Sequence, residues 1–120
     1  MRDRNPFEVF CWYYLGLSPQ GEYRFVNGNR IAKQFNVTVG ELLAFLQKHQ
    51  MHPDVVLNTD FPMARYQVDV QLAAQERGPD QALELAERVY AAFQNRIGNR
   101  RDWLAEIERE REEERQRRHR

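Results

Sequence analysis

The feature that most constrains this chain is an almost unbroken apolar segment near its start. Residues 7–15 carry one charged side chain, that of Glu8. Asn5 is a suitable N-cap, Pro6 suits the first helical position, and Glu8 stands where a capping box needs it. We therefore predict a helix over residues 5–17 rather than a secretory signal peptide. A helix that is apolar nearly all round is buried on more than one side, so other helices must cover it.

The side chains of this aromatic helix have two interpretations. Trp12 and Tyr13 can lie wholly in the core, or they can also contribute to a surface for a protein partner or a second copy. Tryptophan, tyrosine and arginine are typical anchors of protein interfaces. Cys11 has no adjacent positive charge that would lower the pKa of its thiol, so we expect it to be a core residue.

The next two helices are marked by local start signals. Residues 27–29 (Asn-Gly-Asn) predict a turn and the start of a helix that ends at residue 34 or 35. Thr38 and Glu41 have the spacing of a capping box, and apolar residues stand at both positions of a hydrophobic staple. We expect this second helix to end within residues 49–52, before a proline.

The same segment has a recognisable shape. Ile31 and the alanine after it allow two helices to cross closely, and Asn36 stands in the turn, where asparagine adopts a left-handed backbone easily. Leu42 and Phe45 recur at the inward positions of the second helix. In these residues the segment 29–49 resembles a helix-turn-helix. The resemblance implies a fold element and does not by itself imply DNA binding.

DNA recognition would place the start of that second helix against base edges in the major groove. Glu41 is engaged by the predicted capping box and would repel phosphate. Of the plausible base contacts Thr38, Gln47 and Lys48, the last two come late in the helix. The outward positions are Thr38, Gly40, Glu41, Ala44, Gln47 and Lys48. Basic residues that could touch the phosphate backbone are Arg24, Arg30 and Lys33. These features favour a docking surface over a base-reading helix.

The segment 61–77 is open to two interpretations. It fits a helix through Ala64, Val68 and Leu72, and it also alternates as a half-buried strand in a wing would. Its length, its alanine pair and its charged end favour the helix. The preceding residues 54–60 are ambiguous.

A further helix is predicted after the Gly-Pro pair at residues 78–79. Its apolar stripe runs from Ala82 to Ile97, which indicates a core-facing side. We expect Gly98 and the asparagine that follows it to stop or kink this helix, and a last helix to begin at Arg101.

The charged C-terminal segment sets the expected division into domains. The chain holds 18 basic and 18 acidic residues, and residues 100–120 contain eight arginines and seven acidic residues. No part is a basic block, whereas long-range attraction to phosphate needs excess positive charge. We predict a helical domain over residues 1–99, followed over 100–120 by a charged tail that is a solvated helix or frays.

Several classes of function find no support in these residues. His49 and His52 have only Asp54 close by as a further metal ligand. No catalytic triad order, phosphate-cradling glycine loop or paired-carboxylate motif stands out, so we expect no enzyme, no cofactor and no metal. No apolar run approaches the roughly 20 residues that cross a bilayer, and a lone cysteine forms no intrachain disulfide. We expect a cytoplasmic protein, and its arginine-rich composition favours a bacterial source.

Together these patterns predict an all-α fold, a small helical bundle that contains the helix-turn-helix-like pair and carries a charged C-terminal helix. We expect a non-enzymatic regulatory adaptor that binds a signalling or regulatory protein, with homodimerisation as an additional alternative. The runner-up is a helix-turn-helix DNA-binding transcriptional regulator. A third alternative, an enzyme subunit, would need a deep polar pocket with shifted pKa values. The candidate partner contacts are Trp12, Tyr13, Arg24, Arg30, Glu41 and Lys48.

Overall fold

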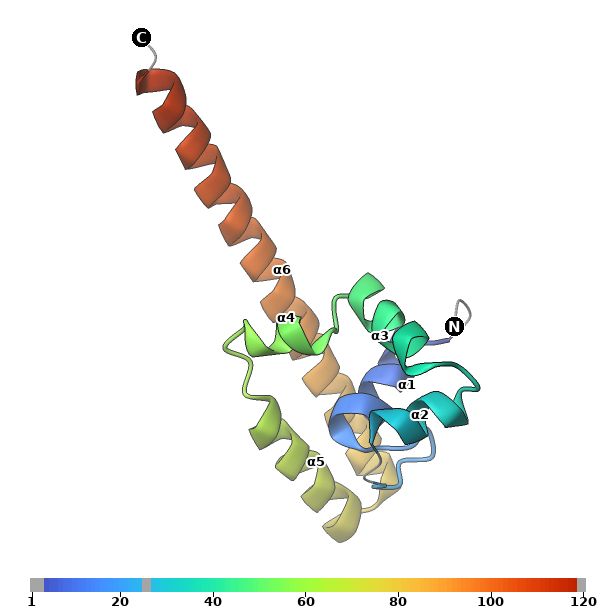
Figure 1. The fold of residues 1–120 in the computed structure, drawn as a ribbon. Coiled ribbons are helices and arrows are strands. Elements are labelled where there is room, and N and C mark those ends of the chain that lie inside the picture. Colours follow the sequence, from blue (N-terminus) through green and yellow to red (C-terminus); the bar gives the residue numbers. More distant parts are fainter. Residues whose placement is uncertain (1–3, 25–26, 119–120) are drawn as a thin grey trace.

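The computed structural model describes residues 4–24 and 27–118, without the side chains of residues 99–107 and 118 inside its last helix. The elements named in these ranges are all helices, which confirms the predicted all-α class (Figure 1). They are α1 (Pro6–Phe10), the π-helical turn η1 (Cys11–Leu15), α2 (Gly28–Gln34), α3 (Val39–Lys48), α4 (Pro53–Leu57), α5 (Met63–Glu76) and α6 (Pro79–Arg118).

The aromatic N-terminal segment forms α1 and continues directly into η1. Asn5 caps α1 by accepting a hydrogen bond from the backbone amide of Phe7 at 2.9 Å. The helix predicted to reach residue 17 is shorter in the structure, because Gly16 takes up a left-handed backbone with a φ of 62°. Glycine adopts this conformation without steric cost and commonly ends helices. Leu17 then pairs with Tyr23 in an isolated antiparallel bridge.

The helices α2 and α3 pack against each other, as the sequence predicts. The Asn27 side chain caps α2, and Thr38 and Glu41 form the predicted capping box at the start of α3. Between them Asn36 has a left-handed backbone with a φ of 57°. The inward side chains Ile31 and Leu42 are buried, so the pair has an apolar inner side and an exposed outer side.

The two segments after α3 that the sequence left open, residues 54–60 and 61–77, both contain a helix. Residues 53–57 form α4, which the His52 side chain caps by accepting a hydrogen bond from the Asp54 amide at 3.1 Å. Residues 63–76 form α5, so the helical prediction is confirmed and the wing strand is wrong. Met63, Val70 and Ala73 are buried on the side of α5 that packs on α6 and η1.

The helix α6 runs without interruption for 40 residues, a length of about 60 Å at 1.5 Å per residue. The predicted stop or kink at residues 98–99 and the separate helix from Arg101 are therefore wrong. A single glycine inside a helix costs only about 1 kcal/mol, which does not end a helix unless a capping turn follows. The predicted domain boundary at residue 99 falls inside this helix, whose second half projects from the body (Figure 1).

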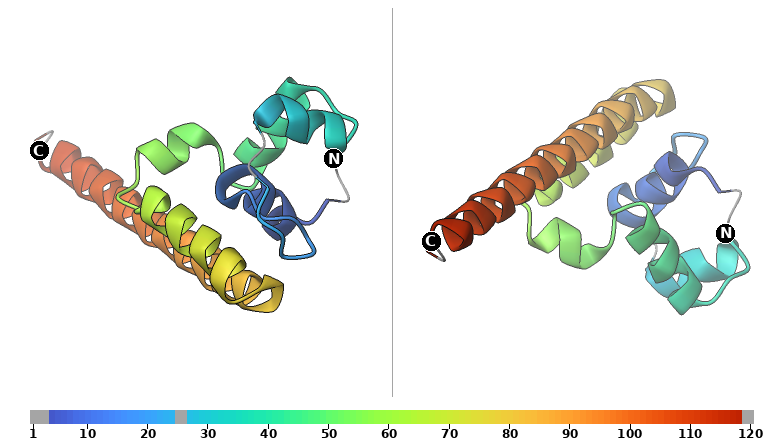
Figure 2. Two further views of the ribbon diagram at one scale, coloured as in Figure 1. Left: turned by 90° about the horizontal axis from the view of Figure 1, so that it is seen from below. Right: turned by 90° about the horizontal axis from the view of Figure 1, so that it is seen from above.

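The aromatic N-terminal segment is the centre of the core. Figure 2 shows α1 and η1 between the α2–α3 pair on one side and the α5–α6 pair on the other. The Phe10 ring centroid lies 5.1–5.5 Å from the ring centroids of Tyr14, Tyr90 and Phe93. This confirms that other helices cover the segment on more than one side. In the described ranges, no helix has the length and apolarity needed to cross a bilayer.

Candidate functional site

Two of the predicted contacts lie on η1, and they differ in exposure. Trp12 is only 5% exposed and belongs to the core. Tyr13 is half-buried, its ring stacks edge-on against Tyr14 with centroids 4.9 Å apart, and it borders the start of α2 at Gly28. Burial raises the pKa of the Tyr13 hydroxyl above its ordinary value. Part of the Tyr13 side chain is therefore accessible to a partner, whereas the Trp12 side chain is enclosed in the core.

The two predicted arginine contacts are exposed. Arg24 forms a surface ion pair with Glu22, with 3.1 Å between the guanidinium nitrogen and the carboxylate oxygen. Such exposed pairs contribute only about 0–1 kcal/mol, so Arg24 can exchange this partner for another at small cost. Arg30 lies on α2, where its backbone amide donates to the Asn27 side chain and its guanidinium extends from an exposed position.

The last two predicted contacts lie on the outer side of α3. Glu41 and Lys48 are both exposed and seven residues apart, which places them on the same helix face about 10 Å apart along the axis. Glu41 accepts a hydrogen bond from the Thr38 hydroxyl at 3.2 Å within the capping box. Because Trp12 is buried, the six predicted contacts do not form one exposed surface.

A second exposed surface lies on α5, which we name the α5 outer face and define as Ala64, Val68 and Leu72. Val68 is 53% exposed and Leu72 is 45% exposed, and Ala64 is also exposed. These residues follow one another at intervals of four, so they share one side of the helix, opposite the buried side. The sequence revealed this stripe as a sign of a helix, but it gave no reason to place the stripe on the surface.

A groove of about 320 Å³ lies between the C-terminal end of α3 and the middle of α6. Its apolar lining includes Met51 and Phe93, each 1% exposed. Lys48 and Gln94 line it from exposed positions, and Gly98 lies along the same wall. No pattern in the sequence predicts this groove, because it depends on how the end of α3 approaches a helix about 45 residues later in the chain.

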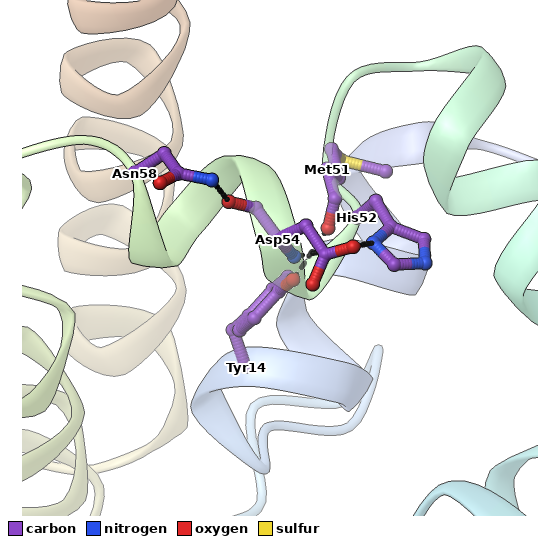
Figure 3. A network of polar contacts seen from close by, with 5 residues as sticks. All are labelled: Tyr14, Met51, His52, Asp54 and Asn58. Atoms are coloured by element: carbon purple, nitrogen blue, oxygen red, sulfur yellow. Dashed lines mark hydrogen bonds and ion pairs between the residues drawn. The ribbon is translucent and has the colours of Figure 1, made fainter.

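Polar contacts join η1 to the start of α4 (Figure 3). The Tyr14 hydroxyl donates to the Met51 carbonyl, and burial raises the pKa of that hydroxyl. The Asn58 side-chain amide donates to the Asp54 carbonyl at 2.7 Å, while His52 accepts the Asp54 amide hydrogen. The Tyr14–Met51 bond ties the connection before α4 to η1, whereas the two bonds to Asp54 are local and stabilise the ends of α4.

The Cys11 thiol is not activated as a nucleophile. It is 3% exposed, and burial, with smaller contributions from Glu8 and Glu87, raises its pKa to about 12. A thiol with this pKa stays protonated at neutral pH, whereas catalytic cysteines need the thiolate. In the part of the chain that the structure describes, no three His, Cys, Asp or Glu side chains gather as metal ligands do.

Comparisons with known proteins assign no relative to the chain. No protein-family model, curated protein or solved structure matches it.

Proposed function

We propose that this protein is a non-enzymatic regulatory adaptor, and that it binds a protein partner through the α5 outer face. The observation that carries the proposal is the exposure of Val68 and Leu72, two large aliphatic side chains one turn apart on a helix whose opposite side is already packed. Aliphatic anchors at intervals of four are the usual contacts when a helix docks into an apolar groove of another protein.

The surroundings of these side chains also resemble an interface. Arg65, Asp69 and Glu76 are exposed on the same helix, so charged residues of both signs lie near the apolar pair. Protein interfaces commonly have an apolar centre within a polar rim. Burying an aliphatic side chain completely contributes about 1.5–3 kcal/mol, and both side chains are already partly covered, so we expect the pair to contribute roughly a hundredfold to affinity.

DNA binding is the second candidate, and the geometry of the α2–α3 pair favours it. Two features support it: Asn36 connects α2 to α3 with a left-handed backbone, and a capping box starts α3, as expected from the resemblance in sequence to a helix-turn-helix. The outer side of α3 is exposed, with Gln47 and Lys48 near its end. Against this candidate, Glu41 stands at the start of α3, where base contacts are normally made.

Two double variants separate these functions. V68E/L72E places two carboxylates on the α5 outer face, and A44E/Q47E places two on the outer side of α3, at positions that are all exposed. A protein captured from the lysate of the source organism is identified, purified and titrated against each variant. We expect V68E/L72E to weaken this binding at least tenfold and A44E/Q47E to leave it unchanged.

The same variants are titrated against duplex DNA. Binding of the intact chain to duplex that falls steeply with salt, and that is lost in A44E/Q47E but kept in V68E/L72E, would refute the adaptor proposal and support the second candidate. Equal affinity of intact chain and V68E/L72E for the captured protein would show that α5 is not the contact surface.

A further inference from the structure

We propose that the groove between the C-terminal end of α3 and the middle of α6 binds a small amphiphilic anion, a molecule with an apolar body and one carboxylate. This proposal does not rest on the adaptor function, because the groove and the α5 outer face share no residue. The class of ligand follows from the size of the groove, its apolar floor and the polar groups at its rim.

The volume of the groove suits a small molecule better than a helix of another protein. At about 320 Å³, it stands at the lower end of the range of roughly 300–1,000 Å³ in which ligand pockets fall. An α-helix with its side chains is about 10–12 Å across and needs more room than this groove offers. We therefore expect a single small occupant.

The floor of the groove is apolar and continuous with the core. Met51 and Phe93, which are buried, are joined there by the half-buried Tyr90 and Ile97. An apolar body that covers this surface removes it from water, which favours binding roughly in proportion to the area covered.

The rim of the groove supplies hydrogen-bond donors and one unpaired positive charge. Lys48 is exposed, and the ion pairs found among the described residues do not include it. Gln50 and Gln94 add carboxamide groups, which donate to carboxylate oxygens. The described lining contains no aspartate or glutamate, and its imidazole, that of His49, is never negative. One ammonium group thus matches one carboxylate, and nothing in the lining repels it.

The backbone at Gln50 gives an independent reason to expect a polar contact with a ligand. It has a φ of 59°, and the amides of Gln50 and Met51 bond back to the carbonyls of residues 47 and 46 to close α3. Glycine is the usual residue at such a helix end, and asparagine is the next; at the corresponding place after α2 the chain has Asn36. The fold gives no reason for a glutamine here, whereas a carboxamide at the groove wall does.

Gly98 keeps one wall of the groove low. A Cβ atom added at this position would meet no atom of a described residue within 4 Å, so packing within the chain does not require a glycine. Helix interiors favour alanine over glycine, so local structure does not require it either. The missing side chain instead leaves room for the occupant.

The first test is isothermal titration calorimetry of the full chain with decanoate, an unbranched carboxylate. Decan-1-ol and decyltrimethylammonium are the matched probes, because they carry an unbranched apolar chain of the same kind with a neutral or a positive head group. We expect a Kd for decanoate below about 1 mM and at least tenfold weaker binding of the other two. Amide chemical shifts should change at Gln50 and Gly98 and not at Val68 and Leu72, which separates the groove from the α5 outer face.

Substitutions at the rim and the wall test the groups themselves. Lys48→Glu reverses the charge at the rim and Gly98→Leu fills the wall, and each should weaken decanoate binding at least tenfold. The matched controls are Lys33→Glu, the same charge change at an exposed position of α2, and Gly40→Leu, at an exposed helical glycine where an added Cβ meets only Thr38 Oγ1, at 3.8 Å. Both controls should bind decanoate as the unaltered chain does, and circular dichroism verifies that every variant is folded.

Gln50→Gly separates binding from structure. Glycine adopts the left-handed backbone without steric cost, so the urea midpoint should rise, while loss of the carboxamide should weaken decanoate binding at least threefold. Equal affinity for the three probes, unchanged decanoate binding in a folded Lys48→Glu or Gln50→Gly variant, or chemical shift changes on α5 alone would overturn the proposal. No binding of decanoate up to about 1 mM would overturn it as well.

Discussion

The Gly21→Ala substitution tests how the turn after η1 docks on the start of α6. Gly21 is buried, has a left-handed φ of 83°, and donates a hydrogen bond from its amide to the Ser18 carbonyl at 2.9 Å. A Cβ atom at this position would lie 2.5 Å from the Pro79 carbonyl oxygen and 2.7 Å from the Pro79 Cβ. Neither Pro79 group can rotate out of the way, so either the turn at Gly21 or the start of α6 must move.

Two separate costs determine how much stability Gly21→Ala should lose. A left-handed backbone at a residue with a side chain costs about 1–2 kcal/mol, and forcing an extra carbon into a packed site costs typically 1–3 kcal/mol. We therefore expect the free energy of unfolding to fall by about 2–5 kcal/mol, measured by urea denaturation with circular dichroism. Gly40→Ala is the control, and it should change stability by no more than about 1 kcal/mol, in the stabilising direction. A Gly21→Ala variant within about 0.5 kcal/mol of the unaltered chain would refute the docking of this turn.

Three further predictions concern single positions. Thr38→Ala removes one half of the capping box and should lower the free energy of unfolding by about 1 kcal/mol in urea denaturation. Gly98→Ala should raise the free energy of unfolding by about 0.5–1 kcal/mol, because alanine favours a helix interior and an added Cβ meets no atom within 4 Å. The pKa of Cys11 rises from 9.0 to about 12 on folding, so the unfolded chain ionises first and stability falls as pH rises through that interval. Denaturation at stepped pH should show this alkaline loss reduced in Cys11→Ala.

The parts of the fold that could be predicted from the sequence are those set by local hydrogen bonds. Thr38 and Glu41 satisfy each other's backbone amides whatever the rest of the chain does, so the start of α3 was predictable. The same holds for Asn36, whose left-handed backbone belongs to the connection itself. Pro79 likewise marks the start of α6, because proline suits the first turn of a helix and cannot continue the preceding helix α5.

The parts that could not be predicted depend on contacts between distant segments. Both Ala64-Val68-Leu72 and Met63-Val70-Ala73 fit a helical side of α5, and only packing on α6 and η1 decides which one is buried. The early end of the first helix has a local cause instead, since Gly16 ends it with a left-handed backbone. The groove depends on the same approach of distant segments, so the sequence carried no signal for it.

The most direct measurement of the central claim is photo-crosslinking in cells of the source organism, with a photoreactive amino acid in place of Val68 or of Gln47. Both positions are exposed, on α5 and on α3. If the protein is an adaptor that uses the α5 outer face, position 68 yields one dominant adduct with a protein, and position 47 yields no adduct with nucleic acid. Adducts with DNA from position 47, together with none from position 68, would contradict the account.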